Sequence, residues 1–170
     1  PAPGVRTMAS RTSCGLCGVE LLRDVEKKVA PVPAGLAIPA RNIHRMVDRL
    51  FTLQPVFQST RAAHAAGLFY PGGEPVVVRE DVGRHNALDK VIGHALMQGI
   101  DCSRLVAVLS SRISFEMVQK ALRALIPVVV AVSAATALAV DLAERNGCTL
   151  AGRVREGGMI VYTHPERIAC

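Results

Sequence analysis

Short apolar runs alternate with amphipathic segments along most of this chain, and this alternation is the strongest constraint on its fold. The predicted strands are 75–78, 105–109 and 128–132, and the predicted helices are 40–53, 86–98, 114–125 and 136–146. Two further apolar segments, 149–154 and 159–163, flank Glu156-Gly157-Gly158 and predict a closing β-hairpin. Strands that alternate with helices indicate an α/β fold, with a mainly parallel or mixed sheet and helices on both faces.

The first two predicted helices each carry an apolar stripe at three- and four-residue spacing, which is typical of a helix packed on a core. In helix 40–53 the stripe consists of Ile43, Met46, Val47, Leu50 and Leu53, and in helix 86–98 it consists of Leu88, Val91, Ile92, Ala95 and Leu96. These residues are therefore predicted to be buried.

The size and composition of the chain favour a single globular domain. With 170 residues, half of them hydrophobic, the chain is long enough for one sizeable core. Residues 1–40 contain five prolines and are predicted to form a loop-rich leader, in which only 21–29 favours a short strand or helical turn. Residues 41–170 are predicted to form the α/β domain. The chain begins without Met and without a signal-peptide pattern, so we expect a fragment or a processed form.

Charge and apolar content exclude several classes of partner. The longest apolar run, 126–135, is shorter than the roughly 20 residues of a membrane span, so no membrane partner is expected. The net charge is +6, but the basic residues are scattered and only 4% of residues are aromatic, which favours a phosphate-bearing ligand over nucleic acid. Five cysteines, an odd number, do not form a secreted disulfide framework, so a reducing cytoplasm is the expected compartment.

Polar side chains follow three of the predicted strands. Ser110-Ser111-Arg112 follow strand 105–109, Ser133 and Thr136 follow strand 128–132, and Arg79-Glu80-Asp81 follow strand 75–78. Ligands of open α/β sheets bind beyond the carboxyl ends of the strands, where helix N-termini attract anions. These strand ends therefore predict a phosphate or nucleotide site. The alternative is that Ser114 and Thr136 merely cap their helices.

The segment 79–86 gathers six ionisable or amide side chains around Gly83, which permits a tight turn. We expect a site with both acidic and basic groups here, including Arg84, and His85 is a candidate proton carrier. The alternative is that Asp81 or Asn86 caps the following helix while the other charges are solvated.

The pair Cys14 and Cys17, in Cys14-Gly15-Leu16-Cys17, has several possible roles. Zinc binding would need two further ligands, which His44 or His64 could supply, and a redox pair would be expected within a βαβ unit. Zinc deaminase chemistry is disfavoured because no His-x-Glu sequence lies upstream of the cysteine pair. Nucleophilic chemistry, with a persulfide as one product, is the remaining possibility. Cys102 and Cys148 are interpreted as ordinary small residues near element ends, and Cys170 as a chain end.

Three motifs, in this order and spacing, resemble the formate dehydrogenase accessory sulfurtransferase (FdhD) family. They are Ser13-Cys14-Gly15-Leu16-Cys17-Gly18, Arg79-Glu80-Asp81-Val82-Gly83-Arg84-His85-Asn86-Ala87-Leu88-Asp89-Lys90 and Phe115-Glu116-Met117-Val118-Gln119-Lys120. The resemblance extends over essentially the whole chain and would correspond to the C-terminal two-thirds of the family.

This resemblance implies a fold similar to that of cytidine deaminase and the function of a homodimeric sulfurtransferase. It implies that sulfur passes as a persulfide from a cysteine desulfurase to the molybdenum bis(guanine dinucleotide) cofactor of formate dehydrogenase. Cys14 matches the persulfide-bearing cysteine and Cys17 its partner. The residues matching the cofactor-binding segment are Arg153, Val154, Arg155, Glu156, Gly157 and Gly158, and the strand-edge residues Arg84, His85, Ser110, Arg112, Ser133 and Thr136 complete the predicted cofactor site.

The chain departs from the family pattern at two glycines of one motif and at an aromatic position of another. The family's Thr-Gly-Gly-x-His is Thr60-Arg61-Ala62-Ala63-His64 here, and its Gly-Phe-x-Arg is Gly152-Arg153-Val154-Arg155. Two other readings stay open: a non-catalytic chaperone that binds the guanine dinucleotide cofactor, and a small zinc-stabilised domain.

Overall fold

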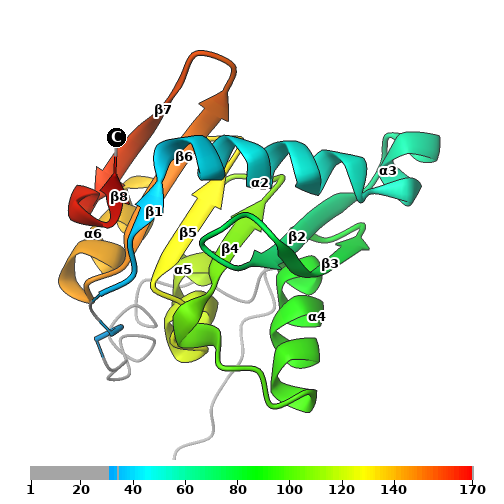
Figure 1. Ribbon diagram of the computed structural model, residues 1–170. Helices are drawn as coiled ribbons and strands as arrows, with labels where there is room; N and C mark the ends of the chain where they lie inside the picture. The colour runs from blue at the N-terminus through cyan, green and yellow to red at the C-terminus, as the bar shows by residue number, and fades with distance from the viewer. Residues whose placement is uncertain (1–30, 34, 170) are drawn as a thin grey trace, which may run out of the picture.

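The computed structural model describes residues 31–33 and 35–169, and a six-stranded mixed sheet forms its centre (Figure 1). Across the sheet the strands are β3 (Pro75–Asp81), β2 (His64–Phe69), β4 (Val106–Leu109), β5 (Val128–Ala131), β6 (Thr149–Arg155) and β7 (Gly158–Thr163). β4, β5 and β6 are parallel, whereas β2 is antiparallel to both its neighbours and β7 is antiparallel to β6. The predicted α/β fold is therefore confirmed, with a mixed sheet that ends in the predicted hairpin.

Helices cover both faces of the sheet, as predicted. α2 (Ala40–Thr52) crosses one face, and α4 (Arg84–Met97), α5 (Phe115–Arg123) and α6 (Ala137–Arg145) lie on the other (Figure 1). Successive residues of β4 and β5 point to opposite faces, and all of them are buried because both faces are covered. Their unbroken runs of Val, Ala and Leu follow from this double burial.

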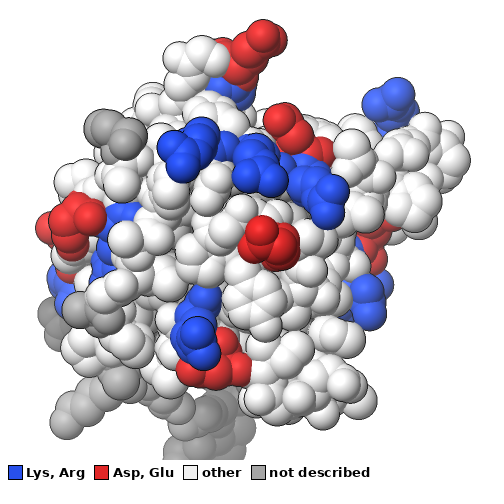
Figure 2. Space-filling view, in the orientation of Figure 1, with Lys and Arg blue, Asp and Glu red and all other residues white. Residues whose placement is uncertain are grey.

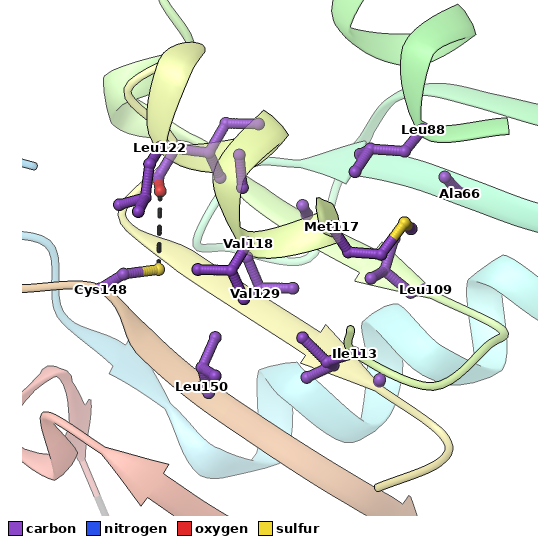
Figure 3. Packing of buried hydrophobic residues seen from close by; sticks show 14 of the residues in the cluster. Ala66, Leu88, Leu109, Ile113, Met117, Val118, Leu122, Val129, Cys148 and Leu150 are labelled. Carbon is purple, nitrogen blue, oxygen red and sulfur yellow. Dashed lines mark hydrogen bonds between the residues drawn. The ribbon is translucent and has the colours of Figure 1, made fainter. Parts of the chain in front are cut away.

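The larger core lies beneath α4, α5 and α6. Met117, Val118 and Leu122 of α5 pack over Val129 of β5 and Leu150 of β6 (Figure 3). All five side chains are buried, and a fully buried aliphatic side chain contributes about 1.5–3 kcal/mol. Burial of this apolar stripe holds α5 against the sheet.

The smaller core lies beneath α2. Ile43, Met46, Val47 and Leu50 are buried against the face of the sheet that α4, α5 and α6 leave free. The predicted fifth member of this stripe, Leu53, is 41% exposed because α2 ends one residue earlier. The stripe prediction is thus confirmed for four residues and wrong for Leu53.

The prediction for α4 is wrong at one residue as well. Leu88, Val91 and Ala95 are buried and Ile92 is partly buried, but Leu96 is 80% exposed. Leu96 lies in the last turn of the helix, at the margin of the apolar stripe. Periodicity identified the buried face but not where the sheet beneath it ends.

Several elements were not predicted from the sequence. β2 is a short run of small and apolar residues that is buried on both faces, so it shows no alternation of polar and apolar residues. α3 (Pro55–Thr60) is a single short helix that follows α2. Two 3-10 turns, η1 (Cys102–Arg104) and η2 (Pro165–Arg167), complete the helical segments of the described part of the chain.

A second, two-stranded parallel sheet joins β1 (Ile38–Pro39) to β8 (Ile168–Ala169). Ile38 is fully buried, and Arg167 donates a hydrogen bond to the carbonyl oxygen of Pro33 at 3.3 Å. The packed body therefore includes residues that the sequence analysis assigned to the leader. No strand was predicted at 38–39, where Pro39 interrupts the pattern. The favoured segment 21–29 lies outside the described residues.

Candidate functional site

The carboxyl ends of four strands meet at one edge of the large sheet. β3, β4, β5 and β6 run in the same direction, although β2 separates β3 from β4. The first residues of β2 and β7 lie at the same edge because these two strands run the other way. The predicted convergence of strand ends is thus confirmed. The predicted end of this strand, residue 78, was wrong: β3 continues to Asp81, so Arg79-Glu80-Asp81 belong to the strand rather than to the loop after it.

The β6–β7 hairpin carries the predicted cofactor-binding segment and encloses a hollow of about 370 Å³. Its lining includes Arg153, Arg155, Glu156, Gly157 and Gly158. Both arginines and Glu156 are exposed, so their charged groups are available to a ligand. Guanidinium groups pair well with phosphate oxygens, so this hollow suits an anionic ligand.

A β-bulge shapes this hairpin. The pairing of β6 with β7 shifts between Gly152 and Arg155, and Arg153 has a left-handed backbone with φ of 53°. The N–H of Arg153 donates to the carbonyl oxygen of Ser133 at 3.0 Å, which ties the hairpin to the loop after β5. A side chain at Gly152 would lie 2.7 Å from that same oxygen. Glycine therefore permits the close approach of the two backbones.

Val154 differs from its neighbours in the segment. Its side chain is 1% exposed and packs in the core beneath α2. Any contribution of Val154 to binding is therefore limited to its backbone and to holding the hairpin on the sheet.

The loops after β4 and β5 pair with each other. The N–H of Ile113 donates to Ala134, and the N–H of Thr136 donates to Ile113, at 3.1 and 3.0 Å. The Thr136 hydroxyl accepts from the N–H of Ala139, so it caps α6 as the alternative interpretation proposed. Ser114 occupies the N-cap position of α5 without a side-chain capping bond. These backbone bonds hold Ser133 and Thr136 at the edge.

Ser110 and Arg112 have different surroundings. The Ser110 hydroxyl accepts a hydrogen bond from the N–H of Ala65 at 2.8 Å and so joins the end of β4 to the start of β2. Arg112 is exposed. Ser110 therefore has a structural task at the edge, while the Arg112 guanidinium faces solvent.

Arg84 and His85 begin α4 at the same edge. Arg84 Nε and His85 Nε2 are buried atoms without a hydrogen-bond partner in the described part of the chain. Burial, and next the positive charge of Arg84, lower the pKa of His85. The imidazole is therefore neutral at physiological pH, as a group that accepts or relays a proton would need to be.

The acidic residues beside Arg84 and His85 are held in structural contacts. Asp81 forms a 2.6 Å salt bridge with Lys90, and its carboxylate also accepts hydrogen bonds from Gly83 N–H and Asn86. Glu80 accepts from the N–H groups of Val56 and Phe57 at 2.9 and 2.7 Å, which caps the N-terminus of α3. Glu80 is thus not the solvated charge that the alternative interpretation expected.

The Asp81 contacts predict a pH dependence of stability. The hydrogen bond from Lys90, followed by that from Gly83, lowers the Asp81 pKa from 3.8 to about 2. A carboxyl group whose pKa is lower in the folded state stabilises the protein above its unfolded pKa and loses this contribution as pH falls toward the folded value. An Asp81→Asn variant should therefore be less stable than wild type at neutral pH, with the difference shrinking from pH 4 toward pH 2.

Urea unfolding across this pH range measures the effect. Asp141→Asn is the matched control, because Asp141 is exposed and has no salt bridge in the described residues. A stability difference for Asp81→Asn that stays constant as the pH is lowered would contradict the assignment.

A second hollow of about 370 Å³ lies beside the same edge. It is lined by Phe51, Gln54, Phe57, Arg61, Ala62, Ala63, His64, Val82 and Ser110. Of these residues, Ser110 was predicted as part of the cofactor site and His64 was considered only as a possible zinc ligand; the others were not predicted, because β2 and α3 were not predicted. Arg61 ends α3 with φ of 57° and places its guanidinium 5.4 Å from the centre of the Phe57 ring. A non-glycine residue in this conformation costs about 1–2 kcal/mol.

The cysteines divide into two groups. Cys14 and Cys17 lie outside the described residues, so their predicted roles are not tested by the geometry. Burial raises the pKa of Cys102, and it raises the pKa of fully buried Cys148 to about 12. Cys148 packs beside Leu150 and Leu122, with Sγ 3.8 Å from the carbonyl oxygen of Ile126 (Figure 3). Both positions agree with the interpretation of ordinary small residues.

These thiol environments predict selective reactivity. At pH 8 a thiol with a pKa of about 12 is ionised in about one molecule in ten thousand, and only the thiolate attacks alkylating reagents. Native protein treated with iodoacetamide should therefore leave Cys148 unmodified, as peptide mass spectrometry can measure. The same reaction after unfolding in urea should modify it. Rapid labelling of Cys148 in the native protein would contradict the burial of this thiol.

Across residues 31–33 and 35–169, no group of three or more His, Cys, Asp or Glu side chains could hold a metal ion. Within the same residues no helix is long and apolar enough to cross a membrane.

Known proteins are similar to this chain in sequence and in fold. The sequence model of the FdhD/NarQ family matches residues 3–169. The chain belongs to the FdhD/NarQ family. Two relatives named sulfur carrier protein FdhD, from Bordetella bronchiseptica and Variovorax paradoxus, are 52% and 46% identical over 164 and 163 residues. Each alignment covers 96% of this chain and 59% of the relative.

A solved structure matches the FdhD/NarQ fold seen here. It is a putative formate dehydrogenase accessory protein from Desulfotalea psychrophila, with a TM-score of 0.78 and 31% sequence identity. The match covers 86% of this chain and 61% of that protein. The chain thus spans about three-fifths of the length of the FdhD/NarQ relatives it matches.

Proposed function

We propose that this chain carries sulfur for the maturation of formate dehydrogenase. The observation that carries the proposal is its 52% identity over 164 residues to a sulfur carrier protein FdhD. The chain would take sulfur from a cysteine desulfurase and deliver it to the molybdenum bis(guanine dinucleotide) cofactor. We place this activity in the reducing cytoplasm and in a homodimer.

Loading is proposed at Cys14. Its thiolate attacks the terminal sulfur of a persulfide on the desulfurase, and the donor cysteine leaves as a thiolate with the bonding electron pair. The product is a persulfide on Cys14. Gly15 and Gly18 directly follow Cys14 and Cys17 and lack side chains that would hinder the donor. Arg6 and Arg11 lie near the pair in the sequence and favour the thiolate.

Release is proposed to use Cys17. Its thiolate attacks the Cys14 sulfur, a Cys14–Cys17 disulfide forms, and the outer sulfur leaves as sulfide. The two electrons gained by that sulfur come from the two cysteine thiols. A cytoplasmic thiol reductant then restores the pair for another cycle.

The carboxyl edge of the sheet is proposed to hold the acceptor as cargo. Guanine dinucleotides carry several phosphates, and Arg153 and Arg155 line an open hollow at this edge. Arg84 has a buried Nε without a partner in the described residues, and Arg112 is exposed nearby in the fold. These cations support binding of a phosphate-rich molecule.

Incubation with a cysteine desulfurase and cysteine tests the proposal. Intact-protein mass spectrometry should show added sulfur that a thiol reductant removes. Guanosine diphosphate should bind the same protein, as calorimetry can measure. A chain that gains no sulfur from an active desulfurase would refute the carrier function.

A further inference from the structure

The second hollow, beside α3 and the start of β2, has an apolar wall that faces solvent. Its lining includes Phe51 and Val82, which are 40% and 82% exposed, and the half-buried ring of Phe57. Large apolar side chains that stay exposed around a concavity are typical of ligand sites. A volume of about 370 Å³ lies within the range of small-molecule pockets. The flat aromatic rings favour a ligand that contains a planar ring.

Polar groups in the same lining can bind the edge of such a ring. Gln54 is 1% exposed, and its amide nitrogen donates to the carbonyl oxygen of Leu50 at 2.8 Å, which leaves the amide oxygen to accept a hydrogen bond. The Ser110 hydroxyl accepts from the N–H of Ala65, which leaves its own proton to donate. Guanine offers the complementary groups, an amino donor and a carbonyl acceptor.

A cation completes this lining. Arg61 is exposed, its guanidinium stacks over the Phe57 ring, and it forms no salt bridge in the described part of the chain. No Asp or Glu is among the described lining residues, and the Glu80 carboxylate is already bonded to N–H groups at the start of α3. Figure 2 shows the surface over α3 without charged side chains and with a basic group at its outer end. A phosphate at Arg61 would therefore meet a cation and no opposing carboxylate in the hollow.

The second hollow is distinct from the hollow of the β6–β7 hairpin. β4 and β5 lie between β2 and β6, so three strand spacings, about 14 Å, separate the two hollows along the edge of the sheet (Figure 1). Each hollow has its own exposed arginine with a left-handed backbone, Arg61 with φ of 57° and Arg153 with φ of 53°. The edge thus presents two separate cationic positions.

We propose that the second hollow binds a guanine nucleotide, with the base against Phe51 and Phe57 and the phosphate on Arg61. This inference deepens the proposed function and rests on it, because the bis(guanine dinucleotide) cargo carries two guanine nucleotides. The hollow of the β6–β7 hairpin holds one of them, and the second hollow holds the other. One chain thereby binds both arms of the cargo.

Calorimetric titration with guanosine diphosphate tests the second site. Wild type should bind two molecules per chain, whereas Arg61→Gly and Arg153→Gly should each retain only one. Glycine adopts a left-handed backbone without strain, so both variants should keep the thermal stability of wild type. Phe57→Leu should weaken about tenfold the binding event that Arg61→Gly removes, because a base loses its stacking partner. The matched charge control is Arg123→Gln, an exposed arginine of α5 that lines neither hollow, and it should bind two molecules.

Three results would overturn the proposal. They are one bound molecule per wild-type chain, a single binding event that both glycine variants weaken, and binding of adenosine diphosphate in the second hollow as tight as that of guanosine diphosphate. Sulfur loading by a cysteine desulfurase is measured separately, and Arg61→Gly should load like wild type. Loading with one bound nucleotide would refute the second site alone. Two bound nucleotides without loading would refute the sulfur carrier function and leave the nucleotide site standing.

Discussion

A Cys14→Ala variant is expected to gain no sulfur from a cysteine desulfurase, while wild type gains sulfur that a reductant removes. The physical reason is that a persulfide needs a thiolate nucleophile, and the two cysteines that the structure describes are poor substitutes. Cys148 is fully buried with its pKa raised to about 12, and burial raises the pKa of Cys102. Intact-protein mass spectrometry and assay of released sulfide measure the loss.

Two further variants define the roles of the cysteines. Cys17→Ala should load sulfur but release sulfide more slowly, because no second thiolate supplies the electrons. Cys148→Ala should load as wild type does, since its thiol is inaccessible in the fold. Sulfur loading of Cys14→Ala at the wild-type level would contradict the proposed function. Tight guanosine diphosphate binding by a chain that never loads sulfur would favour the cofactor-binding chaperone.

A Gly152→Ala variant is expected to lose about 1–3 kcal/mol of folding stability, the usual cost of overpacking. The added Cβ would lie 2.7 Å from the Ser133 carbonyl oxygen and 2.9 Å from the Tyr162 ring. Since that oxygen accepts the Arg153 N–H, the hairpin must shift away from the loop after β5. Guanosine diphosphate binding should weaken about tenfold, the effect of one displaced charge-assisted hydrogen bond.

Gly93→Ala is the matched control for Gly152→Ala. Gly93 lies inside α4, and a Cβ there would meet no atom within 4 Å. Alanine in a helix interior is more stable than glycine by about 0.5–1 kcal/mol, so this variant should gain stability. Urea unfolding and calorimetry measure both effects. Gly152→Ala that folds and binds like wild type would show that the close approach to Ser133 is not required.

Part of the candidate site could be predicted because a general rule of α/β sheets applies to it. Apolar runs identified β4 and β5, and the polar residues after them, such as Ser110 and Ser133, were correctly placed at one edge. Arg153 and Arg155 came from the family resemblance rather than from periodicity. The second hollow was missed because it is built by α3 and the start of β2. A six-residue helix and a strand buried on both faces leave little periodic signal.

The hydrogen-bond partners of polar side chains were the feature least predictable from the sequence. Glu80 caps α3, which lies 24 residues earlier in the chain, and no local pattern indicates this contact. Arg61 and Arg153 adopt left-handed backbones that sequence analysis normally associates with glycine. Here the end of α3 and the bulge in β6 impose those conformations.

The sequence by itself determined the elements with strong apolar periodicity, the α/β class and the cysteine motif, because these depend on residues close together in the chain. The tertiary structure decided which charges are paired and which remain available. Asp81 forms a salt bridge with Lys90, and Glu80 accepts hydrogen bonds at the N-terminus of α3. Arg153 and Arg155, in contrast, remain exposed. The physical reason is that hydrogen bonds and ion pairs depend on which distant segments become neighbours. That choice follows from strand order, which local periodicity does not specify.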